Sequence, residues 1–239
     1  RMEAYLADPA GVEHVERVAR TKLAAAGADP DSWDSMDERT RHTFLAAFFA
    51  GGHDVIIGRR HFTDDAHDTT GLAGSGTLSV AEHRAYTHLA IHAMHSLYEA
   101  NRWVRYVAVF QNWLRPAGAS FDHLHKQLVG IDERGVSAAL ELQRVRANPN
   151  LYNEMGVDYA AYSGLLVASN DHAVAFAGFG HRYPTLEVYS TSATCAPWLM
   201  SREEVDAVSD LVHALHAATG VDVPSNEEWH HKPIDVDQP

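Results

Sequence analysis

The chain has 239 residues and a mass of 26.3 kDa, which is enough for one large domain or two small ones. Hydrophobic residues make up 46% and charged residues 21%, and this excludes disorder and fibrous architectures as the main description. The formal net charge of −13 argues against a general nucleic-acid-binding surface. The 17 histidines are unusually many and favour metal or phosphoryl-transfer chemistry.

Several features indicate where the protein resides. No stretch approaches the ~18 consecutive apolar residues of a membrane span, and the start lacks a basic segment followed by an apolar one. The single cysteine, Cys195, cannot form an intramolecular disulfide and fits a reducing compartment. We therefore expect a cytoplasmic protein without membrane contact. The sequence opens in the middle of a helical pattern, so we also expect a fragment of a longer chain.

Residues 1–50 predict a helical extension. Apolar side chains recur at helical spacing over residues 1–26, and the segment 27–31 interrupts the pattern with Gly, Asp and Pro. A second helix is predicted from about residue 37 to residue 50, because two glycines follow it. We expect these helices to serve packing.

Residues 51–136 predict a strand, a helix and two further strands. The first strand, over 53–57, ends in a β-branched run. Ser79 and Glu82 have the spacing of a capping box, which predicts the start of the helix. The two further strands are predicted over 106–110 and 126–130.

Residues 137–239 predict a connecting helix and a weaker copy of the same order. The segment 172–176 is similar to the first strand, and 200–204 is similar to the helix start at 78–82. We therefore expect an α+β fold. Its antiparallel sheet would be built from the two repeats, with helices packed outside and the helical extension at the N-terminus.

One strand carries the most informative polar residues. Side chains at i, i+2 and i+4 share a strand face, so His123, His125 and Gln127 are expected to project into one site. Burial in a core would cost about 1–3 kcal/mol for each polar group left without a hydrogen bond. A cleft for a polar ligand is therefore favoured over the alternative, a structural His125–Gln127 pair in a half-buried strand.

These residue types suit phosphate chemistry. A neutral imidazole such as His125 can attack phosphorus and carry a nucleotidyl group. Gln127 can donate a hydrogen bond to a phosphate oxygen without adding charge. Four nearby residues offer further donors or positive charge for binding substrate phosphates, namely Asn112, Arg115, Ser120 and Lys126.

Five motifs in order resemble a known family. The pattern Phe-x-Asn followed by Ser-x-x-His-x-His-x-Gln, over 110–127, is similar to the active-site segment of the galactose-1-phosphate uridylyltransferase branch of the histidine-triad superfamily. That superfamily also includes dinucleoside polyphosphate phosphorylases and sugar-nucleotide phosphorylases. The other motifs that agree are Gly52–Ile57, Leu78-Ser79, Tyr183–Val188 and Trp229–Pro233.

The resemblance implies a ping-pong nucleotidyltransferase with a histidine-triad fold. It implies that His125 forms a covalent nucleotidyl-histidine and that Gln127 holds the phosphoryl oxygens. The implied ligands are a nucleotide sugar or a dinucleotide and a phosphate-bearing acceptor, with no organic cofactor; the family also suggests a homodimer. Two alternatives stay open: a phosphorylase or hydrolase of such compounds, and a noncatalytic nucleotide-binding protein of the same fold.

The resemblance also implies zinc. His53 and His123 match ligands of one metal site in the family, and His230 matches a ligand of a second, structural site. The ligand set is incomplete, because no cysteine precedes His53 and the second site's later His-x-His would fall beyond Pro239. The remaining helix histidines and the acidic residues between Glu203 and Asp237 are expected on solvated or partner-facing surfaces.

Overall fold

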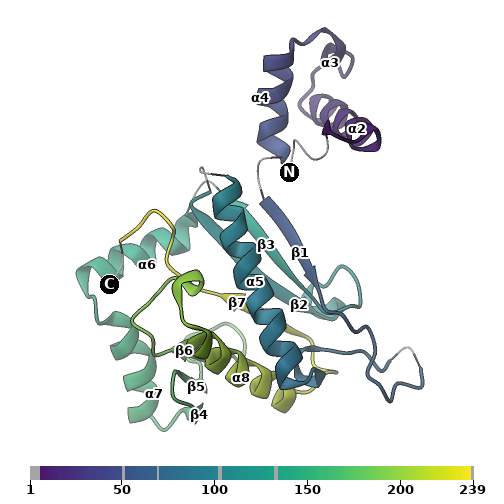
Figure 1. Cartoon of the computed structure of the whole chain (residues 1–239). Helices are drawn as coiled ribbons and strands as arrows, with labels where there is room; N and C mark the ends of the chain where they lie inside the picture. The colour runs from purple at the N-terminus through teal and green to yellow at the C-terminus, as the bar shows by residue number, and fades with distance from the viewer. Residues whose placement is uncertain (1–5, 50–51, 69, 102–103, 132–133, 238–239) are drawn as a thin grey trace.

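The N-terminal part is a small helical unit. The computed structural model describes residues 6–49, 52–68, 70–101, 104–131 and 134–237. The N-terminal helices project from one end of the central sheet (Figure 1). These helices are α2 (Pro9–Ala25), α3 (Ser32–Ser35) and α4 (Glu38–Phe49). They enclose a separate core of buried apolar side chains, formed by Val15, Ala19, Leu23, Trp33 and Leu45.

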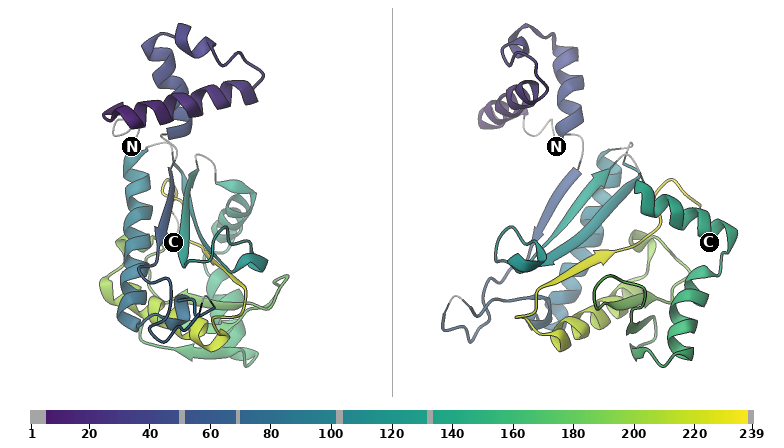
Figure 2. Two further views of the ribbon diagram at one scale, coloured as in Figure 1. Left: turned by 90° about the vertical axis from the view of Figure 1, so that its right-hand side faces the viewer. Right: turned by 180° about the vertical axis from the view of Figure 1, so that it is seen from behind.

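A four-stranded antiparallel sheet forms the centre of the protein. Its strands, in the order β1-β3-β2-β7, are β1 (Gly52–Ile57), β3 (His125–Ile131), β2 (Tyr106–Trp113) and β7 (Ser225–Trp229). Helix α5 (Val80–Ala100) covers one face and begins at the predicted capping box of Ser79 and Glu82. Seen from behind, the strands lie in front of α5 (Figure 2, right). The core between them includes Met94, Val107, Leu124 and Leu128.

The downstream half forms a second sheet. Strands β4 (Leu166–Ser169), β5 (Ala173–Ala177) and β6 (Leu186–Ser190) pair antiparallel, and Ala173 and Ala175 pack against helix α8 (Arg202–Thr219). The remaining helical segments are η1 (Ser75–Thr77), η2 (Arg115–Ala117), α6 (Gly135–Ala147), η3 (Asn153–Val157), α7 (Asp158–Tyr162) and η4 (Pro197–Leu199). No helix in the described part of the chain has the length and apolar character of a membrane span.

The α+β class and the antiparallel pairing are confirmed, whereas the expectation of one sheet shared by two repeats is wrong. The predicted repeat strand is β5, which lies in the second sheet, and β7 joins β2 in the first. The physical reason lies in the side chains of β7. Glu227 and Trp229 turn toward the core of the first sheet, where Glu227 meets the buried Lys126.

Lys126 and Glu227 form a buried ion pair beneath the sheet. The Lys126 side chain is 1% exposed, and its Nζ lies 2.5 Å from Glu227 Oε1 and 3.2 Å from Gln111 Oε1. His216 of α8 and the indole of Trp229 also donate to the carboxylate. The network therefore joins β2, β3, β7 and α8.

Both members of the pair have displaced pKa values. Burial lowers the pKa of Lys126, and the adjacent carboxylate opposes that effect. Burial also disfavours the charged form of Glu227, but Lys126 and the hydrogen bond from His216 outweigh it and hold the pKa of Glu227 well below its usual range. The pair is thus ionised and each charge depends on the other.

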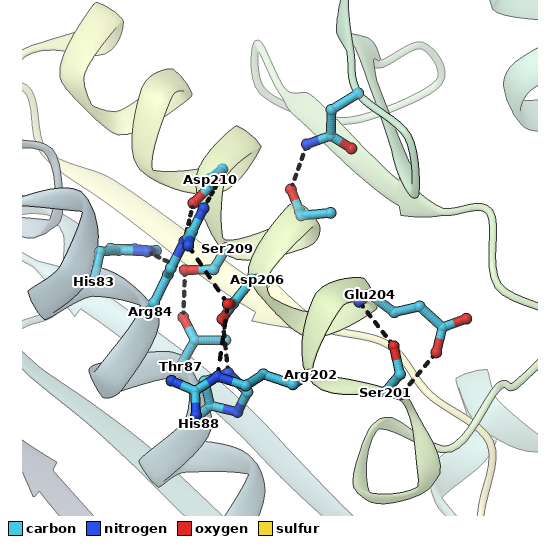
Figure 3. Close-up of polar contacts among 12 residues, drawn as sticks. His83, Arg84, Thr87, His88, Ser201, Arg202, Glu204, Asp206, Ser209 and Asp210 are labelled. Carbon is cyan, nitrogen blue, oxygen red and sulfur yellow. Dashed lines mark hydrogen bonds and ion pairs between the residues drawn. The ribbon is translucent and has the colours of Figure 1, made fainter.

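Helices α5 and α8 are joined by a polar seam (Figure 3). His83 Nδ1 lies 2.8 Å from Ser209 Oγ, and Arg84 forms a two-pronged ion pair with Asp210 at 2.7 and 2.6 Å. His88 Nε2 lies 2.8 Å from Asp206 Oδ1. The expectation of solvated histidines on this helix is therefore wrong for His83, which is 1% exposed.

We expect Lys126→Met to lower the free energy of unfolding by about 3–5 kcal/mol, because Glu227 then remains as a buried charge without a cation. The double variant Lys126→Met/Glu227→Gln should recover part of this loss, because both charges are gone. Urea denaturation at neutral pH measures both. A single-variant loss below about 1 kcal/mol would show that the pair behaves like an exposed one.

The stability should also fall as the pH is lowered from 7 to 5. Burial lowers the pKa of His83 to about 3, with a smaller effect of Lys126, whereas an unfolded histidine titrates near 6.5. Unfolding therefore takes up a proton below pH 6.5, which favours the unfolded chain. His83→Gln should reduce the loss between pH 7 and 5 by about 2 kcal/mol in urea titrations. The exposed His67→Gln is the control, and equal pH slopes for both variants would contradict the expectation.

Candidate functional site

Strand β3 presents His125 and Gln127 on the sheet face opposite α5. Lys126 lies between them and points to the core, so the alternation of a strand places its two neighbours on the other face. The register pairs His125 with Ile57 of β1, and Gln127 with Val55 of β1 and Phe110 of β2. The structure thus brings the two predicted catalytic residues to one position, between β1 and β2.

The hydrogen bond at Nδ1 defines the state of the His125 ring. Nδ1 lies 2.7 Å from the backbone carbonyl oxygen of His123. A carbonyl only accepts, so Nδ1 carries the proton and donates it. In the neutral imidazole the lone pair then stands on Nε2, which is buried and has no hydrogen-bond partner in the described structure. This is the tautomer that a nitrogen nucleophile requires.

Gln127 is oriented by His53 of the neighbouring strand β1. His53 Nε2 lies 3.2 Å from Gln127 Oε1. With the imidazole as donor, the amide oxygen of Gln127 is engaged and its NH2 group is left to donate to a ligand. A neutral donor beside a nucleophile suits a phosphoryl oxygen.

His123 lies outside strand β3 and uses its imidazole on the backbone of the chain beyond β1. The chain bends over 121–123 and β3 begins only at His125. His123 Nε2 donates to the carbonyl of Gly58 at 2.7 Å, and its ring lies 4.5 Å from that of His61. The alternation argument holds only within a continuous strand, so it does not by itself place His123.

The residues predicted to bind phosphate differ in their burial and in their contacts. Lys126 is buried on the opposite face of the sheet and forms an ion pair with Glu227. The prediction that it binds a substrate phosphate is therefore wrong. Arg115 is 80% exposed and lies 3.8 Å from Asp122, and Ser120 is exposed in the same loop. Asn112 donates to the carbonyl of Gly118 at 3.4 Å and therefore supports the loop.

Asn226 of β7 is a site residue that the sequence reasoning missed. Its Nδ2 donates to Asn112 Oδ1 at 2.7 Å and to the carbonyl of Ala117 at 2.8 Å. These bonds tie turn η2 to the end of the sheet. The alternation of side chains along β7 could have identified Asn226. Asn226 and Glu228 face one side of the sheet, and Glu227 and Trp229 face the other. Glu227 was expected on a solvated face, and its burial beside Lys126 corrects that.

The histidines predicted for two metal sites each lie in a different setting. His53 and His123 use their Nε2 atoms on Gln127 and Gly58, and the exposed His230 follows β7, at the sheet edge opposite β1. In the described ranges no group of three or more His, Cys, Asp or Glu side chains is placed to hold a metal ion. The described residues alone therefore do not form a four-coordinate zinc site, and zinc binding stays a prediction.

Comparison with known proteins identifies the fold. A family model described as a domain of unknown function, DUF4921, matches residues 1–239. No curated protein matches the sequence. A uridylyltransferase mutant is 19% identical with a TM-score of 0.61, and the match covers 78% of this chain and 61% of that one.

Two solved proteins from Arabidopsis thaliana are similar to the same extent. A GalT-like protein is 18% identical with a TM-score of 0.62, covering 78% of this chain and 60% of that one. An ADP-glucose phosphorylase with bound ADP-glucose is 15% identical with a TM-score of 0.62, covering 78% and 58%. This chain thus spans about three fifths of the length of these structures. At these identities the likeness shows a shared fold.

We expect Asn226→Ala to loosen the loop between β2 and β3, because two hydrogen bonds of about 0.5–1.5 kcal/mol each are lost. Amide hydrogen exchange followed by mass spectrometry should show faster exchange in peptides that cover residues 114–122. Asn153→Ala, at an exposed helix position, is the matched control and should leave those peptides unchanged. Unchanged exchange in Asn226→Ala would show that the loop is held by other contacts.

Proposed function

We propose, from the premise that this chain belongs to the DUF4921 family and has the uridylyltransferase fold, that it is a nucleotidyltransferase with His125 as the nucleophile. The observation that carries the proposal is the hydrogen bond from His125 Nδ1 to the His123 carbonyl, which leaves the lone pair on Nε2. Gln127 lies on the same sheet face as a neutral donor. Binding alone would need neither feature.

The reaction follows from these atoms. Nε2 attacks the α-phosphorus of a nucleoside diphosphate sugar or a dinucleotide, a P–N bond forms, and the anhydride P–O bond breaks to release a phosphate-bearing fragment. The ring becomes positively charged, and the His123 carbonyl stabilises the proton that stays on Nδ1. Gln127 donates to a phosphoryl oxygen as charge develops there. A phosphate-bearing acceptor then attacks phosphorus and restores the free imidazole.

The second candidate function differs from the transferase only in the acceptor of the nucleotidyl group. The ADP-glucose phosphorylase of the same fold holds ADP-glucose, which favours a nucleotide sugar as donor for this chain as well. With inorganic phosphate as acceptor the protein would be a phosphorylase, and with water a hydrolase. The loops that would contact the acceptor decide between these outcomes.

We expect a nucleotidyl adduct on His125 when the protein is incubated with UDP-sugars, ADP-glucose and dinucleotides in turn. After an alkaline quench, intact mass spectrometry should show the mass of one nucleotidyl group, and acid should remove it. His125→Asn should abolish the adduct because it lacks the nucleophilic nitrogen. His67→Asn, in an exposed loop, should retain it.

The acceptor is identified by chasing the labelled protein with inorganic phosphate, a hexose 1-phosphate or buffer alone. Loss of the adduct with a hexose 1-phosphate would indicate a transferase, loss with inorganic phosphate a phosphorylase, and loss in buffer alone a hydrolase. Failure of every donor to label the protein would contradict the enzyme proposal. An adduct that persists in His125→Asn would contradict the assignment of the nucleophile. Donor binding without an adduct would favour a noncatalytic nucleotide-binding protein.

A further inference from the structure

The ring of Phe121 lies over the candidate nucleophile. The centroids of Phe121 and His125 are 4.0 Å apart, and the ring planes differ by 21°. Phe121 is 40% exposed, whereas His125 is 2% exposed. His125 is therefore almost fully covered although the neighbouring side chains of β1, Val55 and Ile57, are 45% and 54% exposed.

The covered atom is the one that the proposed reaction needs. His125 Nε2 is buried and has no hydrogen-bond partner among the described residues. A buried polar atom without a partner costs free energy, so its position calls for a reason. A reacting phosphorus must come within about 3–3.5 Å of the nucleophile. Because Nε2 is buried, a donor phosphate can reach it only after neighbouring side chains move.

The cover belongs to the loop that joins β2 and β3, residues 114–124. Its first part is anchored, because Asn226 holds the carbonyl of Ala117 and Asn112 holds that of Gly118. The second part, from Ser120 to Asp122, is a bend with exposed side chains. Asp122 is held to Arg115 at 3.8 Å by an exposed ion pair, which is a weak restraint. The loop is thus fixed at η2 and can yield at Phe121.

We propose that Phe121 is a movable shield, closed over the imidazole ring of His125 in the free protein and displaced with residues 120–122 when the phosphate donor enters. The stacked ring shields one face of the imidazole and holds its plane. Phe121 is a positioning residue, because it acts through His125. The role in catalysis rests on the function proposed for His125, whereas the closed state of the free protein is measurable without any donor.

Diethyl pyrocarbonate tests the shield, because it acylates an unprotonated imidazole nitrogen that solvent can reach. Peptide mass mapping follows the rate of modification at three histidines of one sample. His125 is the target, the exposed His67 is the reference, and His83, 1% exposed, reports that the core is intact. Wild type is compared with Phe121→Ala and Phe121→Ser, which remove the ring, and with Phe121→Leu, which keeps apolar bulk.

In wild type we expect His125 to react at least about tenfold more slowly than His67, because reaction requires a local opening. Phe121→Ala and Phe121→Ser should bring His125 to within about threefold of His67 while His83 stays protected, and Phe121→Leu should stay near wild type. Equal rates for His125 and His67 in wild type would overturn the proposal. So would continued protection of His125 in both ring-free variants. Absence of a nucleotidyl adduct would contradict the proposed function and leave this measurement unaffected.

Discussion

The buried ion pair between Lys126 and Glu227 is the contact on which the candidate site depends. Lys126 stands between His125 and Gln127 in β3, so its side chain fixes which face of the strand each neighbour takes. Its partner Glu227 lies in β7, whose pairing with β2 brings Asn226 to the loop that follows β2. A charge pair beneath the sheet thereby places the proposed nucleophile and its supporting residues above it.

The two faces of the sheet satisfy their polar groups in opposite ways. Beneath the sheet, Lys126, Glu227 and His216 bind one another, which a buried charge requires. On the opposite face, His125 keeps one nitrogen bonded to the His123 carbonyl and the other unpartnered beneath Phe121. Among the described residues this atom is one of four buried side-chain nitrogens without a hydrogen-bond partner, and its place on the sheet face of Gln127 is what links it to the candidate site.

The features that sequence reasoning predicted correctly have local causes. The capping boxes at Ser79 and Ser201 each depend on a glutamate three residues later, and the shared face of His125 and Gln127 depends on the period of one strand. The errors concern distant partners. Lys126 was assigned to a phosphate because its partner Glu227 lies 101 residues away, and β7 was not expected in the first sheet for the same reason. The bend before β3, which places His123 outside the strand, has no clear local signal.

The tautomer of His125 is the central claim that connects this fold to phosphorus chemistry. Long-range 1H–15N correlation spectra of protein labelled with 15N-histidine report the protonated nitrogen of each ring, and the spectrum of His125→Gln identifies the signals of His125 by their loss. The hydrogen bond to the His123 carbonyl predicts that Nδ1 carries a proton, so that the lone pair of the neutral ring stands on Nε2. A ring protonated on Nε2, with Nδ1 free, would contradict the account.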